Sequence, residues 1–196
     1  NNTIKTNGEE GIYLSSIKNS SIIENTIIHN GKNGLRLDSN SGNNTIANNT
    51  IFYNQQNGIQ SANCTNTYIR HNHISENKQN GLFLSSCENF NIIGNNISAN
   101  HYDGIKALKC SSSEITNNIA NFNPQNGVYL ENCSVILVST CDFEFNNFNG
   151  VYLYNSNNCR IIDNLNSFIN NSFCAIFLNY SHHNTITGNS VHNSSI

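Results

Sequence analysis

The sequence is short of charge. Asp, Glu, Lys and Arg together make up 11% of the chain, and the formal net charge is −3. Lys and Arg occur singly along the sequence, so they form no basic stripe that could neutralise a phosphate backbone. This pattern argues against nucleic acid as a partner.

Methionine and tryptophan are absent, proline occurs once, and no apolar run approaches the ~18 residues of a membrane span. The first residues, Asn1 to Lys5, do not resemble a signal peptide. The sequence therefore predicts no membrane span. Asn-X-Ser/Thr sequons, such as those at Asn19 and Asn132, favour an extracellular or cell-surface location, with any signal peptide outside this chain.

What the chain does contain is one short phrase written repeatedly: a small residue, an aliphatic residue, a variable residue and an aliphatic or small residue. The phrase begins at Gly11, Gly34, Gly58, Gly81, Gly104, Gly127, Gly150 and Ala175. Successive starts lie 23 to 25 residues apart. A fixed period of this length is typical of a solenoid.

Asparagine, about a fifth of the chain, also recurs in columns. One column stands two residues before an aliphatic residue, at Asn25, Asn49, Asn72, Asn95, Asn117 and Asn189, with Cys141 replacing Asn once. Another stands directly before the Gly phrase, at Asn33, Asn57, Asn80, Asp103, Asn126 and Asn149. Asn and Asp accept left-handed backbone conformations, so both columns predict sharp corners. At one corner we expect each Asn amide to bond the backbone of the next coil and form a ladder.

The segments between the corners are too short for helices and rich in β-branched residues. We therefore predict an all-β fold: a single-stranded parallel β-helix of about eight coils of about 23 residues, with three short strands per coil. Residues 1–196 are expected to form a single solenoid. Both ends stop inside a coil, so we expect a piece of a longer chain, or a unit whose ends are covered by other copies or by flanking domains.

The unit from Asn25 to Leu37, which reads N-x-I-x-x-N-x-x-N-G-L-x-L, resembles the right-handed parallel β-helix repeat of NosD-like proteins and of carbohydrate-binding or carbohydrate-cleaving β-helices. The resemblance covers essentially the whole chain. It implies a right-handed fold, as does the general preference for right-handed crossovers. Because the matching residues are structural, it implies little about activity.

Four cysteines form a column of their own: Cys64, Cys87, Cys110 and Cys133 are each 23 residues apart. They must stack, and the favoured interpretation is a buried turn position, since Cys often acts as a small interior hydrophobe. A redox pair or a soft-metal site is the alternative. A straight column spreads its sulfurs over about 14 Å, whereas a metal site needs convergent ligands.

The variable position of the Gly phrase is expected to point outward. Its column reads Tyr13, Arg36, Gln60, Phe83, Lys106, Tyr129, Tyr152 and Phe177, and Tyr154 lies in the neighbouring outer column. Aromatic side chains in a row suit sugar rings, so Tyr129, Tyr152, Tyr154 and Phe177 are the predicted ligand contacts. Alternatively, they cover a strand surface or pack under an adjoining chain.

Catalysis has fewer candidates. Glycoside hydrolysis needs two carboxyls about 5–9.5 Å apart, but Asp38 and Glu131 are separated by four coils, or about 19 Å. The best remaining cluster is Lys106 with His101, Asp103 and Glu131, which could abstract a proton in a polysaccharide lyase or epimerase. A surface ion pair between Lys106 and Glu131 is the simpler interpretation.

His71 and His73 flank Asn72 and could share a metal ion. The NosD-like resemblance implies copper, but the neighbouring coils supply no third ligand, so solvated surface histidines are favoured. We therefore predict no metal site and no cofactor.

Taken together, the sequence predicts a noncatalytic extracellular or cell-surface module. Its predicted role is structural or carbohydrate-binding, with a glycan, a second copy of the chain or flanking domains as partners. A carbohydrate-active lyase or epimerase is the alternative function, and a copper accessory protein is the third.

Overall fold

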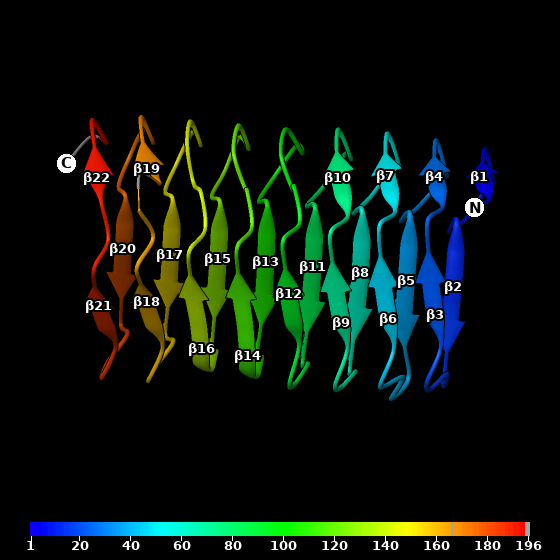
Figure 1. Cartoon of the computed structure of the whole chain (residues 1–196), viewed down its shortest axis with the longest axis horizontal. Coiled ribbons are helices and arrows are strands. Elements are labelled where there is room, and N and C mark those ends of the chain that lie inside the picture. Colours follow the sequence, from blue (N-terminus) through cyan, green and yellow to red (C-terminus); the bar gives the residue numbers. More distant parts are fainter. Residues whose placement is uncertain (166, 195–196) are drawn as a thin grey trace.

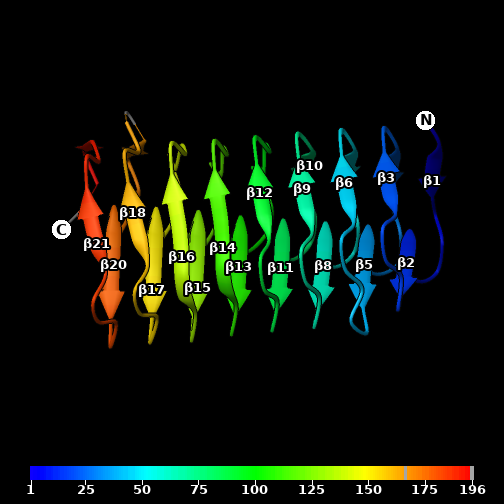
Figure 2. The ribbon, with the colours of Figure 1, turned by 60° about the horizontal axis from the view of Figure 1, so that its bottom comes forward.

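The computed structural model describes residues 1–165 and 167–194, and they form a parallel β-helix whose coils stack side by side along one axis (Figures 1 and 2). Ser195 and Ile196, which end the predicted solenoid, lie outside the described residues. The predicted all-β class is confirmed. Within the described ranges there is no helix long and apolar enough to cross a membrane.

The Gly phrases build one face of the solenoid, an 8-stranded parallel sheet. Its strands are β2 (Ile12–Ser15), β5 (Leu35–Asp38), β8 (Ile59–Ala62), β11 (Leu82–Ser85), β13 (Ile105–Leu108), β15 (Val128–Glu131), β17 (Val151–Tyr154) and β20 (Ile176–Asn179). Each strand pairs with its counterpart one coil further on, so equivalent residues lie opposite each other. The sheet therefore turns each sequence column into a straight row on the surface.

The other two faces follow the same rule. The second is an 8-stranded sheet of β3 (Ser21–Ile23), β6 (Thr45–Ala47), β9 (Tyr68–Arg70), β12 (Asn91–Ile93), β14 (Ser111–Thr116), β16 (Ser134–Ser139), β18 (Arg160–Ile162) and β21 (Thr185–Thr187). The third contains β1 (Thr3–Lys5), β4 (Thr26–Ile28), β7 (Thr50–Phe52) and β10 (His73–Ser75) at one end and β19 (Phe168–Ile169) with β22 (Val191–His192) at the other. Between them the face continues through single bridges, such as Asn96 with Ile119.

The core lies between the three faces and runs the length of the solenoid. Alternate residues of each strand point inward, and the two inward positions of the Gly phrase are buried in the inner coils, as in Leu35 and Leu37, and half-buried in the first and last. Phe90, Phe143 and Phe168 are the largest fully buried side chains. The predicted inward and outward positions of the Gly phrase are thus confirmed.

Glycine opens the phrase because the coils approach each other closely there. A Cβ atom placed on Gly34 would lie 2.5 Å from a methyl group of Ile51, 2.7 Å from the carbonyl oxygen of Gly58 and 2.8 Å from the amide nitrogen of Asn54. Any side chain would push the next coil away. Glycine therefore recurs at this position because the coils pack too closely to admit a side chain.

The predicted asparagine ladder is confirmed. Asn72 Oδ1 accepts hydrogen bonds from the backbone N–H and from the side-chain amide of Asn49, at 2.9 and 3.0 Å. Asn72 Nδ2 donates to the carbonyl oxygen of Ile46, at 2.9 Å. One buried amide therefore satisfies both a donor and an acceptor of the preceding coil's backbone, at a corner where sheet pairing cannot. Asn25, Asn49, Asn95 and Asn189 occupy the same ladder.

One predicted ladder residue is wrong by a single position. Asn118, not Asn117, accepts from the backbone N–H of Asn95, at 2.9 Å. Asn117 instead adopts a left-handed conformation, with φ of 55°. The same is true of Glu24, Asn48 and other residues that directly precede the ladder. The left-handed turn at this corner thus belongs to the residue before the ladder Asn, which the turn aims inward.

Two further ladders run along other corners. Asn30, Asn54, Asn77, Asn100, Asn123, Asn146 and Asn171 form the first of them, with bonds in the same direction. The column before the Gly phrase forms the second, and its bonds run in the opposite direction, since Asn80 donates to Asn57 Oδ1. The sequence motif contains both columns, but we assigned a ladder only to the first corner.

Cys64, Cys87, Cys110 and Cys133 stack in a buried column. The thiols act like short ladder side chains: Cys133 Sγ accepts from the backbone N–H of Cys110 and donates to the carbonyl oxygen of Ala107, both at 3.4 Å. In the next coil Ser156 takes the same position and accepts from the N–H of Cys133, at 3.0 Å. These contacts agree with the interpretation of the cysteine column as a buried turn position.

Cys141 interrupts the first ladder and allows a test of it. Its Sγ lies 3.9 Å from Asn118 Nδ2, a longer contact than any amide makes. We expect Cys141→Asn to raise the free energy of unfolding by about 1 kcal/mol, because a second strong acceptor bond would form. Asn95→Cys is the matched control and should lower it by a similar amount or more. Denaturant titration measures both, and a Cys141→Asn variant less stable than the parent would contradict the ladder account.

Candidate functional site

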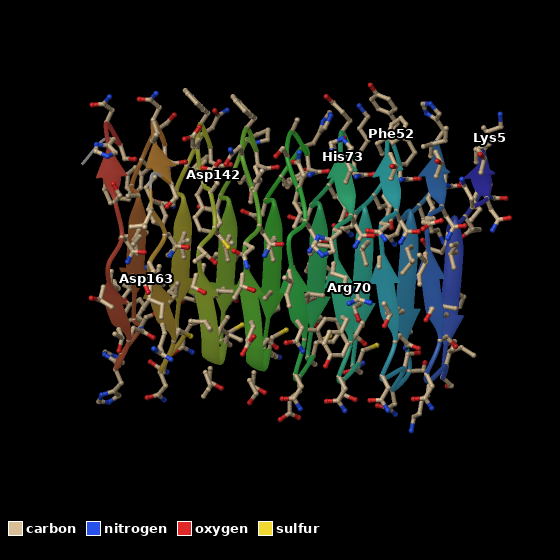
Figure 3. The ribbon with its side chains drawn as sticks, viewed as in Figure 1. Lys5, Phe52, Arg70, His73, Asp142 and Asp163 are labelled. Carbon is tan, nitrogen blue, oxygen red and sulfur yellow. The ribbon has the colours of Figure 1, made fainter. Side chains whose placement is uncertain are left out.

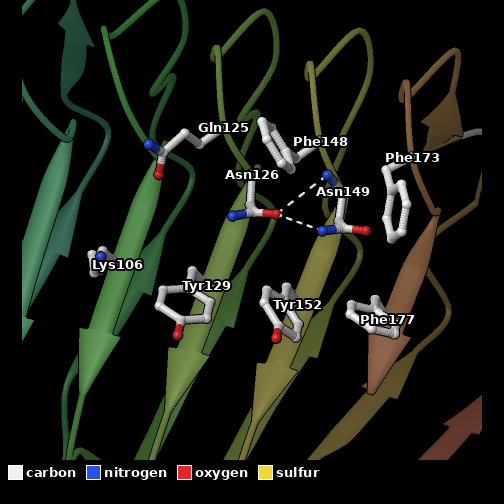
Figure 4. A pocket seen from close by; sticks show the side chains of 9 residues that line it. All are labelled: Lys106, Gln125, Asn126, Tyr129, Phe148, Asn149, Tyr152, Phe173 and Phe177. Atoms are coloured by element: carbon white, nitrogen blue, oxygen red, sulfur yellow. Dashed lines mark hydrogen bonds between the residues drawn. The ribbon is translucent and has the colours of Figure 1, made fainter. Parts of the chain in front are cut away.

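A groove of about 450 Å³ lies along the surface, and we call it the aromatic groove (Figure 4). Its lining consists of Lys106, Gln125, Asn126, Tyr129, Phe148, Asn149, Tyr152, Phe173 and Phe177. These residues come from four successive coils, so the groove runs along the solenoid axis.

One side of the groove is the outer row of the Gly-phrase sheet. Lys106, Tyr129, Tyr152 and Phe177 lie opposite one another on β13, β15, β17 and β20. The ring centroids of Tyr129 and Tyr152 are 5.1 Å apart, and those of Tyr152 and Phe177 are 4.8 Å apart. Because neighbouring rings cover each other, this row presents mainly ring edges to a ligand.

The opposite side is built from corner residues. Gln125, Phe148 and Phe173 each stand two residues before the small residue of the phrase, so the same period aligns them. Phe148 is 54% exposed and Phe173 is 50% exposed. The ring of Phe173 meets Phe177 edge on, at 5.8 Å between centroids. The strand alternation does not predict this row, because its residues lie in corners between strands.

The floor of the groove is polar and belongs to the reversed ladder. Asn149 donates from its backbone N–H and from Nδ2 to Asn126 Oδ1, at 3.2 and 2.8 Å (Figure 4). In the next coil Cys174 replaces Asn, and the buried Oδ1 of Asn149 has no hydrogen-bond partner among the described residues. An unpartnered buried acceptor costs about 1–3 kcal/mol, so this end of the ladder is weaker than its interior.

Charge is confined to one end of the groove. Lys106 Nζ lies 4.9 Å from the ring centroid of Tyr129 and 3.9 Å from Asp103 Oδ2. The Asp103 side chain is 1% exposed. Burial raises the pKa of the Asp103 carboxyl, although hydrogen bonds from Asn126 and the charge of Lys106 act to lower it.

Three of the four predicted catalytic residues are linked there. Asp103 contacts Lys106, and Glu131 joins through Tyr129, whose phenol donates to Glu131 Oε2 at 3.0 Å. His101 is exposed, and no hydrogen bond of its imidazole is found within the described ranges. The structure therefore brings together a lysine, two carboxyls and a phenol, without the histidine.

Tyr154, a predicted ligand contact, does not line the aromatic groove. Its row on the sheet contains Glu131 and Asn179, and its ring meets Tyr180 edge on, at 6.0 Å between centroids. The reason is the strand period: Tyr154 lies two residues beyond Tyr152, so it shares the outer face but sits further from the corner row that closes the groove.

His71 and His73 diverge. His71 occupies the left-handed position before the ladder and packs against Gly94 of the next coil. His73 lies on β10 (Figure 3). Its Nε2 is 3.4 Å from the hydroxyl of Ser75. Across residues 1–165 and 167–194, no three His, Cys, Asp or Glu side chains are grouped closely enough to hold a metal ion. Within these residues the structure therefore supplies no third ligand beside His71 and His73 for a copper ion.

Nearer the N-terminus the same surface rows carry ion pairs. Lys32 bonds Glu9, and Arg36 bonds Asp38 at 2.6 Å and Glu10 at 3.4 Å. These charged side chains pair with one another, whereas the aromatic groove exposes the phenyl rings of Phe148 and Phe173. The groove is therefore the stretch of this surface that is best prepared for a ligand.

Comparison with known proteins agrees with the architecture. The family model of the right-handed beta helix region matches residues 1–120 and 80–195. No curated protein sequence matches the chain.

Several solved structures are similar in fold. The periplasmic alginate epimerase AlgG aligns at 17% identity with a TM-score of 0.79, over 94% of this chain and 50% of that one. The A-module of the Azotobacter vinelandii mannuronan C-5 epimerase AlgE6 aligns at 17% identity and 0.81, over 97% and 56%. The Streptococcus pneumoniae surface protein and adhesin PfbA aligns at 15% identity and 0.76, over 99% and 65%. The chain thus spans about half the length of the epimerases, and at these identities the likeness concerns the fold alone.

Tyr129 provides a test of the groove's electrostatics. Burial, together with the hydrogen bond and the charge of Glu131, raises the pKa of the Tyr129 phenol well above its ordinary value. In an alkaline ultraviolet titration we expect the phenolate signal lost in Tyr129→Phe to lie at the high-pH end of the curve. Glu131→Gln should move that signal to lower pH, because a repulsive charge is removed. A Tyr129 signal at the ordinary tyrosine pKa would contradict the contact.

Proposed function

Because the chain belongs to the right-handed beta helix family, whose fold lays equivalent residues in rows along one axis, we propose that it is a noncatalytic glycan-binding module. The ligand is an extended oligosaccharide that lies in the aromatic groove, parallel to the axis. A location outside the cell or on its surface is part of the proposal, since the similar structures include a periplasmic enzyme and a surface adhesin.

The observation that carries the proposal is the mixed lining of the groove. Phe148 and Phe173 offer exposed ring faces, and apolar faces of this kind suit the C–H surfaces of pyranose rings. Gln125 supplies an amide and Lys106 an ammonium group, which suit sugar hydroxyls. A purely apolar partner would leave these polar groups without bonds and would bind less well.

The shape of the groove supports a linear ligand. Its lining residues repeat with the coil, so successive coils present similar contacts at the spacing of the sheet. A polymer of similar units can occupy such a site in repeated fashion. Four coils of contact give several weak interactions that add along one chain, and this suits polysaccharides better than a compact small molecule.

The binding test uses glycan arrays followed by titration calorimetry with the best ligand. We expect Phe148→Ala and Tyr152→Ala each to weaken binding about tenfold, because each removes a central apolar contact. Tyr68→Ala is the matched control, since Tyr68 is an exposed tyrosine on β9, outside the groove. Equal losses in all three variants, or binding unaffected by Tyr152→Ala, would contradict the assignment.

A second candidate function is proton abstraction from a uronate, favoured by the contact between Lys106 and the buried Asp103. Fold likeness to two epimerases agrees with this candidate but does not carry it. If the chain is such an enzyme, Lys106→Ala should lower release of unsaturated uronate, or solvent deuterium incorporation, by about 100-fold or more. Lys109→Ala, at an exposed corner, is the control. Activity that survives Lys106→Ala would end this assignment.

The predicted structural role rests on self-association or flanking domains and stays a prediction. Light scattering over a concentration series tests the self-association part.

A further inference from the structure

The reversed ladder beneath the groove has a regular chemistry. Each residue donates from its backbone N–H and from Nδ2 to the Oδ1 of the residue one coil before it. The Nδ2 to Oδ1 distance is 2.9 Å from Asn80 to Asn57, 2.7 Å from Asn126 to Asp103 and 2.8 Å from Asn149 to Asn126. Each member of the ladder therefore needs a donor hydrogen on the side-chain atom at the Nδ2 position.

Asp103 occupies the same ladder position as the asparagines, but its side chain has no Nδ2 to act as a donor. Its backbone N–H donates to Asn80 Oδ1 at 3.1 Å, and its own Oδ1 accepts from Asn126. By the repeat, Oδ2 takes the place of the donor Nδ2 and faces Asn80 Oδ1. Oδ2 is buried and has no hydrogen-bond partner among the described residues. An ionised Asp103 therefore sets two acceptors against each other, whereas a protonated Asp103 donates O–H to Asn80 and completes the ladder.

The groups around Asp103 come from three coils, and the charged and titratable ones come from two of them. Lys106 on β13 is 3.9 Å from Oδ2. On β15, Tyr129 faces the carboxyl, with Glu131 behind it. The preceding coil contributes the neutral Asn80 and, beside Lys106, Phe83. His101, two residues earlier in the chain, is exposed.

We propose that Asp103 determines which glycans the aromatic groove accepts. In its protonated form it completes the ladder and releases Lys106 to bind the acid group of a carboxylated or sulfated sugar. In its ionised form it holds Lys106 and repels such a group. The inference rests on the proposed glycan-binding function and adds the ligand class and its control by pH.

The direction of the pH effect follows from the contacts. Burial raises the pKa of Asp103 in the folded chain, so the folded state holds this proton more tightly than the unfolded state does. The destabilisation caused by the ionised form is absent below the ordinary carboxyl pKa. It is incurred as the pH rises through the folded-state pKa.

The ladder proton is tested by thermal unfolding of Asp103→Asn, which restores the amide that neighbouring coils carry. Its melting temperature should exceed that of the wild type by about 3 °C at about pH 8, and the difference should vanish near about pH 4. Asn57→Asp is the matched control, since it puts an acid at the same ladder position two coils away and should show the opposite, pH-dependent loss. A difference for Asp103→Asn that is equal at both pH values would overturn the inference.

Ligand selection is tested with a hexuronate and with the neutral hexamer obtained by reducing its carboxyl groups. At about pH 8, Asp103→Asn should bind the hexuronate about fivefold more tightly than the wild type does, and should bind the neutral hexamer equally well. Lys106→Ala in the same background should remove the gain. For the wild type, binding of a sulfated hexamer, which stays ionised throughout, should strengthen as the pH falls.

The outcomes separate the two proposals. Equal gains for both hexamers would overturn selection by charge while leaving glycan binding intact. A wild-type chain that binds neither hexamer, nor any array glycan, would overturn the proposed function and glycan selection together. The unfolding series would still decide whether Asp103 holds the ladder proton.

Discussion

The hydrogen bond between a buried corner amide and the backbone of the neighbouring coil is the interaction on which this structure depends. At a corner the backbone leaves the sheet, and its N–H and C=O groups would be buried without partners. Asn72 bonds one N–H and one C=O of the preceding coil's backbone, and Asn95 does the same for the coil that contains Asn72. The ladder thereby fixes the register of the coils, and the register aligns every surface row.

The ladder also explains where the sequence is constrained and where it is not. Amide positions and the glycine are held by contacts with a neighbouring coil, and the inward aliphatic positions are held by burial in the core. Outward positions such as Arg36, Phe83 and Tyr152 belong to one column whose residue type changes from coil to coil. Ion pairs occupy this surface near the N-terminus and aromatic rings occupy it near the C-terminus, on an unchanged backbone. Function is therefore expected in the outward rows.

The period made the fold predictable from the sequence, because a repeated Gly phrase with fixed inward positions leaves few alternatives. The error at Asn117 arose where two asparagines adjoin, since the sequence does not say which one turns and which one points inward. The groove was half predicted. Tyr129, Tyr152 and Phe177 follow from the strand alternation, but Phe148 and Phe173 lie in corners, whose side-chain directions depend on left-handed residues that no simple alternation describes.

Departures from the ladder differ in consequence according to what surrounds them. Cys141 lies inside the core, where a weak acceptor only loosens one contact. Asp103 lies beneath a groove and next to Lys106, so its proton is coupled to a surface charge. An amide at this position would serve the fold better, since it would bond Asn80 at any pH. A carboxyl at the ladder position that contacts Lys106 lowers stability once the pH rises above its folded-state pKa, so we expect its benefit to lie in what Lys106 binds.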